Sequence, residues 1–302
     1  MACLGLCLTA GQQSFRSEND LVRVFVTVID HDGKLVTNLT KDDFEVRDDG
    51  KPQPIVVFDN TPRPIRLIAM LDVSSSMEGN LPLLRGGTRA LVSSLGKDDL
   101  ARVGTFGKTI DISPAFTSDP RELESALPTA IDPEAPTPLW RAIDRAMNTF
   151  EKDTPERRVV LVLSDGGNFE PVSFRQRPMS QVEIIDRSRD EDVMLYAVAM
   201  RSRPGRQQQV GLGAGGLQQA MMANEPDPGL ARAAEQSGGG FTQINFNQDL
   251  GRVFADVLDE LHSQYLLGYE PPKKDGKVHN IEIKMRTKGL DPRARKNYRA
   301  EK

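Results

Sequence analysis

Hydrophobic and polar residues change their spacing twice along the chain. Between residues 21 and 30, the segment LVRVFVTVID alternates valines with other residues, which is the period of a strand with one buried face. A turn signal at Asp49-Gly50 separates DFEVRD from the apolar run IVVFD. The pattern over residues 20–62 therefore predicts a small antiparallel unit, which has too few strands to close a sandwich.

Strand-like patterns return at the other end of the chain. They cover QYLLGYE (264–270), KVHNIEIKMR (277–286) and the arginine-rich tail. We infer that residues 20–62 and 263–302 join in one discontinuous β-sandwich. The alternative is a pair of separate extensions that flank the central part.

The central part, residues 63–262, alternates apolar runs with helical stretches. The apolar runs lie at 65–71, 101–106, 158–164 and 192–200. The helical stretches lie at 80–95, 120–127, 138–151, 179–190, 228–237 and 247–262. Near-continuous apolar strands are typical of a parallel sheet that is covered on both faces. The pattern predicts a doubly wound, mostly parallel, Rossmann-like α/β domain.

Residues 201–229 interrupt this alternation. They are rich in Gly, Gln and Pro and have no steady period, which indicates a flexible surface insertion. The segment GLGAGG within it resembles a dinucleotide-binding fingerprint only superficially, because no strand leads into it through a tight turn.

Composition excludes several classes of function. A formal net charge of -4 argues against a nucleic-acid partner. Both cysteines, Cys3 and Cys7, precede the folded body, and the histidines at 31, 262 and 279 lack metal-ligand spacing. These features argue against a disulfide framework, a zinc site and a cysteine nucleophile. We interpret Arg157, Arg158 and the tail arginines as solvated.

The first residues, MACLGLCLTAGQQ, form a short apolar run that ends in small residues. We interpret residues 1–19 as a leader-like segment, and the alternative is a disordered N-terminus. Either reading predicts no membrane span, because no run reaches about 18 apolar residues, and at most a tether at the N-terminus. The leader reading places the protein outside the cytoplasm.

One loop contains the first candidate ligands for a metal ion. The strand IRLIAML runs into Asp72-Val-Ser74-Ser75-Ser76, so a carboxylate and two hydroxyls follow the carboxyl end of a strand. Ligands bind at that edge of an open α/β sheet. Ligands that are all oxygen suit a hard divalent cation, with Mg²⁺ ahead of Mn²⁺ or Ca²⁺. The alternative is an ordinary serine-rich turn.

Two later segments favour the metal site. Thr137 lies between prolines just before a predicted helix, and Asp165 follows the apolar run RVVLVLS. Both residues are expected at the same side of the predicted sheet. Three separate segments therefore direct oxygen ligands to one region.

The motifs DVSSSM, TPLW and VLVLSDGG, in this order, resemble the metal-ion-dependent adhesion site of von Willebrand factor A domains. The resemblance covers residues 63–262. It implies that Ser74, Ser76 and Thr137 are hydroxyl ligands of the metal. It also implies that Asp72 and Asp165 bind the ion directly or through water.

The flanking segments are similar to a narrower bacterial family of von Willebrand factor A-related proteins, abundant in acidobacteria, whose members usually begin with a secretion signal. The resembling phrases are VTVIDHDGKLVTNLTKDDFEVRDDGKPQPIVVF, QYLLGYEPP and HNIEIKMRTKGLDPRARKNY. This resemblance supports the extracytoplasmic location. It supplies no biological task.

The resemblance implies a metal-dependent, adhesion-type module that binds a Glu or Asp carboxylate of a partner protein. Two alternatives stay open, namely a structural module of the bacterial envelope and a metal-dependent hydrolase. The hydrolase is disfavoured because the nearest candidate base is Glu78, which we interpret as a solvated carboxylate at a helix start. The sequence does not identify the partner, the ion or the oligomeric state.

Overall fold

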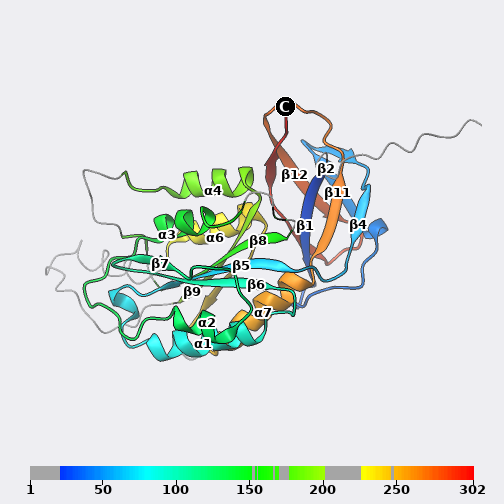
Figure 1. The fold of residues 1–302 in the computed structure, drawn as a ribbon. Helices are drawn as coiled ribbons and strands as arrows, with labels where there is room; N and C mark the ends of the chain where they lie inside the picture. The colour runs from blue at the N-terminus through cyan, green and yellow to red at the C-terminus, as the bar shows by residue number, and fades with distance from the viewer. Residues whose placement is uncertain are drawn as a thin grey trace, which may run out of the picture.

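The computed structural model describes residues 21–302, apart from 152, 153, 155, 166, 170–176, 201–225, 246 and 247. The described chain forms an α/β domain and a smaller β-sandwich beside it (Figure 1). This confirms the predicted fold class, a doubly wound, mostly parallel sheet with a second all-β sandwich from both chain ends. The segment 1–19 and most of the predicted insertion 201–229 lie outside the described residues.

A six-stranded sheet forms the centre of the α/β domain. Its strands are β5 (Ile65–Asp72), β6 (Leu100–Phe106), β7 (Ile110–Ile112), β8 (Arg157–Ser164), β9 (Val193–Met200) and β10 (Phe241–Ile244). Their order is β10-β9-β8-β5-β6-β7, and β7 is the antiparallel member among these described strands. β5 and β8 are thus neighbours at the point where the chain reverses its winding, which is the usual ligand position in such sheets.

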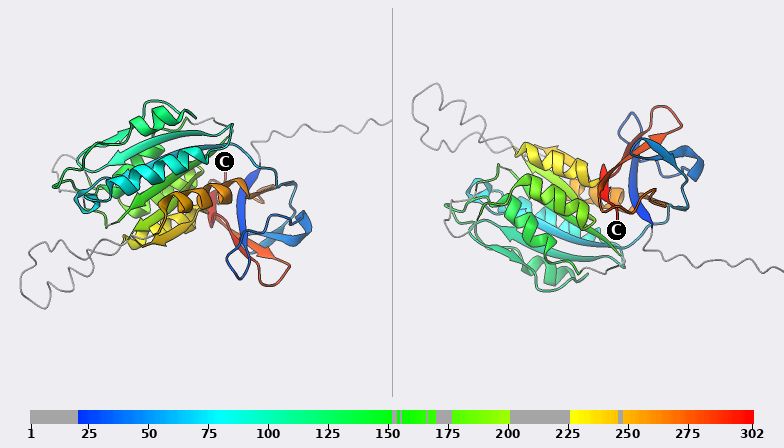
Figure 2. Two further views of the ribbon diagram at one scale, coloured as in Figure 1. Left: turned by 90° about the horizontal axis from the view of Figure 1, so that it is seen from below. Right: turned by 90° about the horizontal axis from the view of Figure 1, so that it is seen from above.

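Helices cover both faces of the sheet (Figures 1 and 2). One face packs against α1 (Leu81–Ser93), α2 (Pro120–Ser125) and α7 (Leu250–His262). The other face packs against α3 (Leu139–Met147), α4 (Gln181–Asp190) and α6 (Pro228–Ser237). In β5, Leu67 and Leu71 face the first layer, whereas Ile68 and Met70 face the second. Burial on both sides explains why the long strands are unbroken apolar runs.

The β-sandwich consists of two four-stranded sheets. One contains β1 (Val22–Ile29), β4 (Val57–Asp59), β11 (Tyr265–Tyr269) and β13 (Asp291–Arg293). The other contains β2 (Phe44–Asp48), β3 (Lys51–Gln53), β12 (Val278–Met285) and β14 (Asn297–Arg299). In each sheet an N-terminal strand pairs with a C-terminal one, β1 with β11 and β2 with β12. The alternative of two separate flanking extensions is therefore wrong.

The Asp49-Gly50 turn connects different strands from those we predicted. Its residues have positive φ angles of 46° and 78° and close a two-residue hairpin between β2 and β3. The run IVVFD does not follow this turn as the partner of β2, because its last part, β4, pairs with β11 in the other sheet. A two-residue turn brings the chain back directly beside the strand that precedes it. The three residues after the turn, β3, therefore pair with β2.

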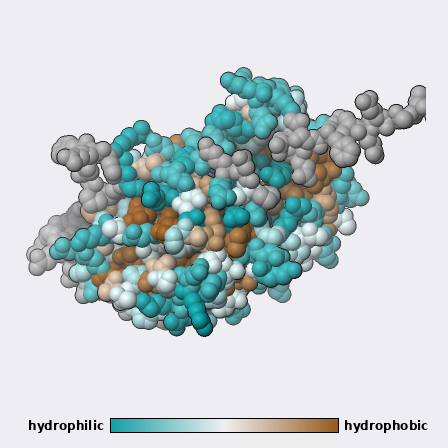
Figure 3. All heavy atoms as spheres, viewed as in Figure 1, coloured by the Kyte–Doolittle hydropathy of each residue, from teal (hydrophilic) through white to brown (hydrophobic). Residues whose placement is uncertain are grey.

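The described surface is largely hydrophilic on the face seen in Figure 3, with small hydrophobic groups between the polar ones. Among the described residues, the large apolar side chains that are exposed belong to separate elements, and Phe169 is the most exposed of them at 67%. In the same part of the chain, no helix combines the length and apolar character that a bilayer crossing requires.

A carboxylate near the end of α7 joins the two parts of the molecule. Glu260 accepts hydrogen bonds from the Thr27 hydroxyl at 3.0 Å, from the Tyr196 hydroxyl and from the Arg293 guanidinium. Gln264 donates to the Thr27 hydroxyl at 2.9 Å and to the Tyr196 hydroxyl at 3.2 Å. Thr27 and Arg293 belong to the sandwich and Tyr196 belongs to β9, so the network holds the two parts together.

We predict that Glu260→Ala lowers the free energy of unfolding by about 3 kcal/mol, because it removes the carboxylate that pairs with a partly buried guanidinium. Urea unfolding followed by circular dichroism measures the change. The matched control is Asp256→Ala, on an exposed position of the same helix, which is expected to change stability by less than about 0.5 kcal/mol. Equal losses in the two variants would contradict the role given to Glu260.

Candidate metal centre

Asp72 is the last residue of β5, and its carboxylate is fully buried at the carboxyl edge of the sheet. The backbone N–H of Ser74 donates to Asp72 Oδ1 at 2.8 Å, which turns the chain sharply after the strand. A short 3₁₀ turn, Ser75–Met77, follows, with Met77 buried beneath it. The loop therefore begins with a fixed carboxylate and presents its serines around it.

Asp165 reaches the same place from the neighbouring strand. β5 and β8 are parallel with Leu71 opposite Leu163, so both strands end at the same level. Ser76 Oγ donates to Asp165 Oδ1 at 2.7 Å, and the hydroxyls of Ser74 and Ser76 are 3.0 Å apart. The structure thus brings together four of the five predicted residues, Asp72, Ser74, Ser76 and Asp165, through hydrogen bonds.

Thr137 belongs to a third loop, which leads into α3. Its backbone exchanges two hydrogen bonds of 2.9 Å with Phe169, four residues after Asp165. In the same loop, the carbonyl of Ala135 accepts a hydrogen bond of 3.1 Å from the N–H of Ser75. Thr137 is buried and lies between these contacts, so the loop is attached to both of the others.

The electrostatics of this edge suit a cation. Burial and the nearby Asp165 carboxylate together raise the pKa of Asp72 to about 7, against the hydrogen bonds from Ser164 and Ser74 that lower it. Among the described residues, no ion pair joins Asp72 to a basic side chain. Two buried carboxylates surrounded by serine and threonine hydroxyls provide the oxygen donors that a hard divalent cation requires. The residues present therefore fit such an ion.

Sequence reasoning missed Ser164, which is buried at the end of β8. Its hydroxyl donates to Asp72 Oδ2 at 2.5 Å, so it occupies the second oxygen of that carboxylate. The signal was present, because Ser164 is the polar residue that ends an otherwise apolar strand just before Asp165. Asp227, the N-cap of α6, was also missed; its Oδ2 accepts a 3.3 Å hydrogen bond from the N–H of Asn168.

Glu78 is exposed, and it ends the 3₁₀ turn instead of starting a helix. Gly79, with φ of 88°, separates it from Asn80, the N-cap of α1. The predicted position at a helix start is therefore wrong. Gly79 adopts the left-handed conformation between the turn and the helix, so α1 begins only after it.

A second group of possible ligands lies in the sandwich. His279 Nδ1 is 3.0 Å from Asp48 Oδ1 and 3.1 Å from Asp49 Oδ2, and the three ligand atoms lie within 4.8 Å of one another. This group could hold an ion on distance alone. The other ring nitrogen of His279, Nε2, is however 3.1 Å from Asp275 Oδ1. Both ring nitrogens thus face carboxylate oxygens, which only accept hydrogen bonds when ionised.

The protonated ring explains this geometry without a metal. Burial opposes a charged His279, but hydrogen bonds to Asp275 and Asp48 outweigh that effect and raise its pKa. An imidazolium donates from both nitrogens and leaves no lone pair for an ion. The second oxygen of Asp48 accepts from the hydroxyls of Tyr269 at 2.9 Å and Tyr298 at 2.7 Å. The cluster is therefore a hydrogen-bonded polar core of the sandwich.

We predict that His279→Gln removes a pH-dependent part of the stability. A pKa raised by folding stabilises the native state below the ordinary histidine pKa of about 6.5, and this stability is lost as the pH rises through the raised value. Unfolding free energies of wild type and variant should therefore differ most below pH 6.5 and converge only when the pH exceeds the raised pKa of His279.

The matched control is His31→Gln, because the His31 side chain is 81% exposed. It should leave the pH profile unchanged. A stabilisation by Zn²⁺ at pH 7 that depends on His279 would contradict the protonated imidazolium and would make the cluster a metal site.

Residues 67–168 match the family model of the von Willebrand factor type A domain. The matched span contains Asp72, Ser74, Ser76, Thr137 and Asp165. A search of curated proteins found no match.

Several solved structures are similar to parts of this chain. A von Willebrand factor type A protein from Catenulispora acidiphila is 10% identical, with a TM-score of 0.51 and coverage of 95% of this chain and 76% of that one. The conserved hypothetical protein BatB from Bacteroides thetaiotaomicron is 15% identical, with a TM-score of 0.45 and coverage of 65% and 98%. Proximal thread matrix protein 1 from the mussel byssus, with a zinc-occupied MIDAS motif, is 18% identical, with a TM-score of 0.45 and coverage of 71% and 49%.

Proposed function

Because the chain contains a von Willebrand factor type A domain, a module that usually mediates protein interactions, we propose that it binds a partner protein through a divalent cation. The observation that supports this most strongly is the pair of buried carboxylates at the ends of β5 and β8, which are linked through Ser74 and Ser76. In the proposed site Asp72, Ser74, Ser76, Thr137 and Asp165 hold the ion. Magnesium is the preferred ion, ahead of manganese and calcium.

An ion held by hydroxyls and two carboxylates keeps part of its charge. It therefore attracts a further anionic oxygen, and a Glu or Asp side chain of a partner protein supplies one. The chain's own residues fix the geometry: Ser164 and the Ser74 backbone hold the Asp72 carboxylate, and Phe169 holds the Thr137 loop. The leader-like N-terminal sequence supports binding outside the cytoplasm.

Two other functions have weaker support. A structural module of the bacterial envelope needs no ion, so this function does not explain why two carboxylates are buried together. A hydrolase needs a base beside the metal, and the nearest candidate on the loop, Glu78, is an exposed residue at the end of the 3₁₀ turn. We therefore propose a binding function without enzymatic turnover.

Isothermal titration with Mg²⁺ tests the metal site. Wild type should bind one ion, with an affinity that rises about tenfold per pH unit below pH 7, because Asp72 must lose a proton whose pKa is about 7. Asp165→Asn should abolish the heat, while the exposed control Asp256→Asn should not. Unchanged binding by Asp165→Asn would refute the assignment.

Phe169 is the candidate for a partner contact beside the ion. Its side chain is 67% exposed and its backbone is paired with Thr137, so it lies at the rim of the site. Exposed aromatic side chains are frequent anchors in protein interfaces. We predict that Phe169→Ala weakens partner binding about tenfold and leaves Mg²⁺ affinity unchanged.

Capture from envelope extracts in Mg²⁺ and in EDTA identifies the partner, and titration of the captured protein measures the loss. The control is Val182→Ala on α4, whose side chain is 61% exposed. A set of captured proteins that is the same with and without EDTA would count against metal-dependent binding. Equal weakening by both variants would count against Phe169.

A further inference from the structure

A cleft lies where the β-sandwich meets the amino ends of β8 and β9. The sandwich contributes Arg23 and Phe25 of β1 and Arg295 from the loop before β14, and the α/β domain contributes Arg157 and Arg158 of β8. This is the opposite edge of the sheet from the proposed metal centre, since Asp72 and Asp165 follow the carboxyl ends of the strands. The cleft is therefore a separate place in the molecule.

The cleft carries more positive than negative charge. Its two carboxylates already have partners, because Glu156 pairs with Arg66 at 3.2 Å and Asp192 pairs with Arg295 at 2.8 Å. Arg23, Arg157 and Arg158 have no carboxylate within ion-pair distance among the described residues. Such a surplus of guanidinium groups is typical of sites that bind oxyanions.

Arg157 is the least solvated of these cations, with 8% of the residue exposed. It donates to the Leu261 carbonyl at 2.6 Å and to Gln264, and its guanidinium lies over the Phe25 ring at 4.6 Å. These direct partners are uncharged, and burial lowers the pKa of Arg157 to about 10, although the Asp99 and Glu260 carboxylates act on it at longer range in the opposite direction. A buried cation with no carboxylate in direct contact is costly, so a negative ligand nearby would stabilise it.

Buried donors in the same cleft also lack partners. Arg157 Nε, Arg295 Nε and Thr154 Oγ1 are buried and make no hydrogen bond within the described chain. All three residues line the cleft. Water could accept these hydrogen bonds, but it supplies no charge to balance the guanidinium groups.

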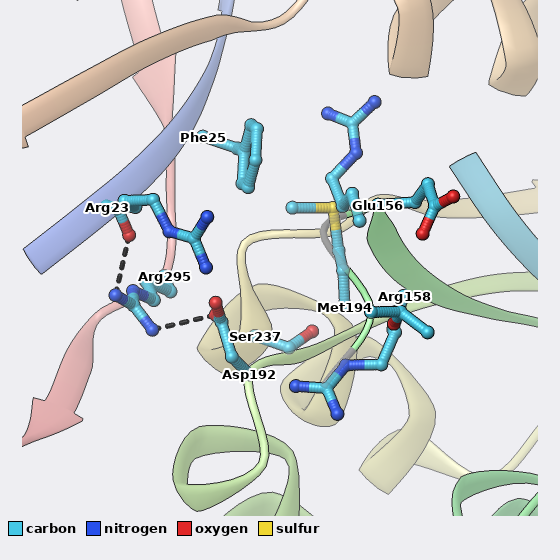
Figure 4. A pocket seen from close by; sticks show the side chains of 10 residues that line it. Arg23, Phe25, Glu156, Arg158, Asp192, Met194, Ser237 and Arg295 are labelled. Carbon is cyan, nitrogen blue, oxygen red and sulfur yellow. Dashed lines mark hydrogen bonds and ion pairs between the residues drawn. The ribbon is translucent and has the colours of Figure 1, made fainter. Parts of the chain in front are cut away.

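Figure 4 shows Arg23 on the sandwich side of the cleft and Arg158 on the side of the α/β domain, with Asp192 and Ser237 between them. The Arg23 side chain is exposed and the Arg158 guanidinium donates to the Glu191 carbonyl. One wall belongs to the sandwich and the other to the α/β domain. A ligand between them would contact both parts of the molecule.

We propose that this cleft binds a tetrahedral oxyanion, a phosphate or sulfate group, which cross-links the β-sandwich and the α/β domain. Planar guanidinium forks match the spacing of phosphate and sulfate oxygens. The bound group neutralises the charge surplus and holds the junction closed. The sequence interpretation of Arg157 and Arg158 as solvated arginines is wrong for Arg157, because the sandwich covers it.

Titration of the full chain with inorganic phosphate and with sulfate, at constant ionic strength, tests the proposal. Wild type should bind one ion saturably, and its melting temperature should rise by a few degrees at saturating anion. Arg23→Gln and Arg158→Gln should each weaken binding about tenfold or more. Acetate should bind more weakly than phosphate.

The matched control is Arg121→Gln, an exposed arginine on α2 outside the cleft, and it should bind phosphate like wild type. Mg²⁺ titration of the Arg23→Gln variant should match wild type, so this test does not depend on the metal site. The proposal is overturned if wild type shows no saturable binding, if Arg121→Gln weakens binding as much as the cleft variants, or if acetate binds as well as phosphate.

Discussion

The structure depends on the burial of two carboxylates at the ends of adjacent parallel strands. Asp72 and Asp165 meet because β5 and β8 lie side by side with their carboxyl ends level. Their mutual repulsion and burial raise the pKa of Asp72 to about 7, which makes the metal-free site unfavourable at neutral pH. For a raised carboxyl pKa, the contribution of Asp72 to the stability of the metal-free fold is greatest below pH 4 and falls as the pH rises toward 7. In the proposed site a divalent cation would offset this cost, so the buried charge that destabilises the metal-free fold would favour ion binding.

Helices α1 and α7 connect this carboxyl edge of the sheet with the sandwich. α7 begins beside α1, where a side-chain carbon on Gly87 would lie 2.6 Å from Leu250, and it ends at the Glu260 network. α1 follows the metal loop directly, and β11 follows α7 after two residues. The packed helices α1 and α7 thus run from the carboxyl edge of the sheet, where the candidate metal site lies, to the sandwich at the opposite edge. The two proposed ligand sites lie at the two ends of this path.

Sequence patterns predicted the elements that bury whole faces. The four long strands were recognisable because burial on both sides makes them continuously apolar, and Asp72 and Asp165 were recognisable because each ends such a run. The short edge strands β7 and β10 were missed, since three or four residues carry no measurable period and β10 buries only Ile244. The pairing of Thr137 with Phe169 and that of Arg293 with Glu260 were also missed. Such contacts depend on how separate elements pack, which no local pattern encodes.

Thermal unfolding at pH 8, with and without Mg²⁺, tests the central claim most directly when wild type is compared with Asp72→Asn. The account predicts that Asp72→Asn melts at a higher temperature than wild type without Mg²⁺, because the buried charge is gone. It also predicts that Mg²⁺ stabilises wild type and leaves the variant unchanged. If the variant melts lower than wild type without Mg²⁺, or if Mg²⁺ stabilises both proteins equally, the carboxylate pair is not a metal site.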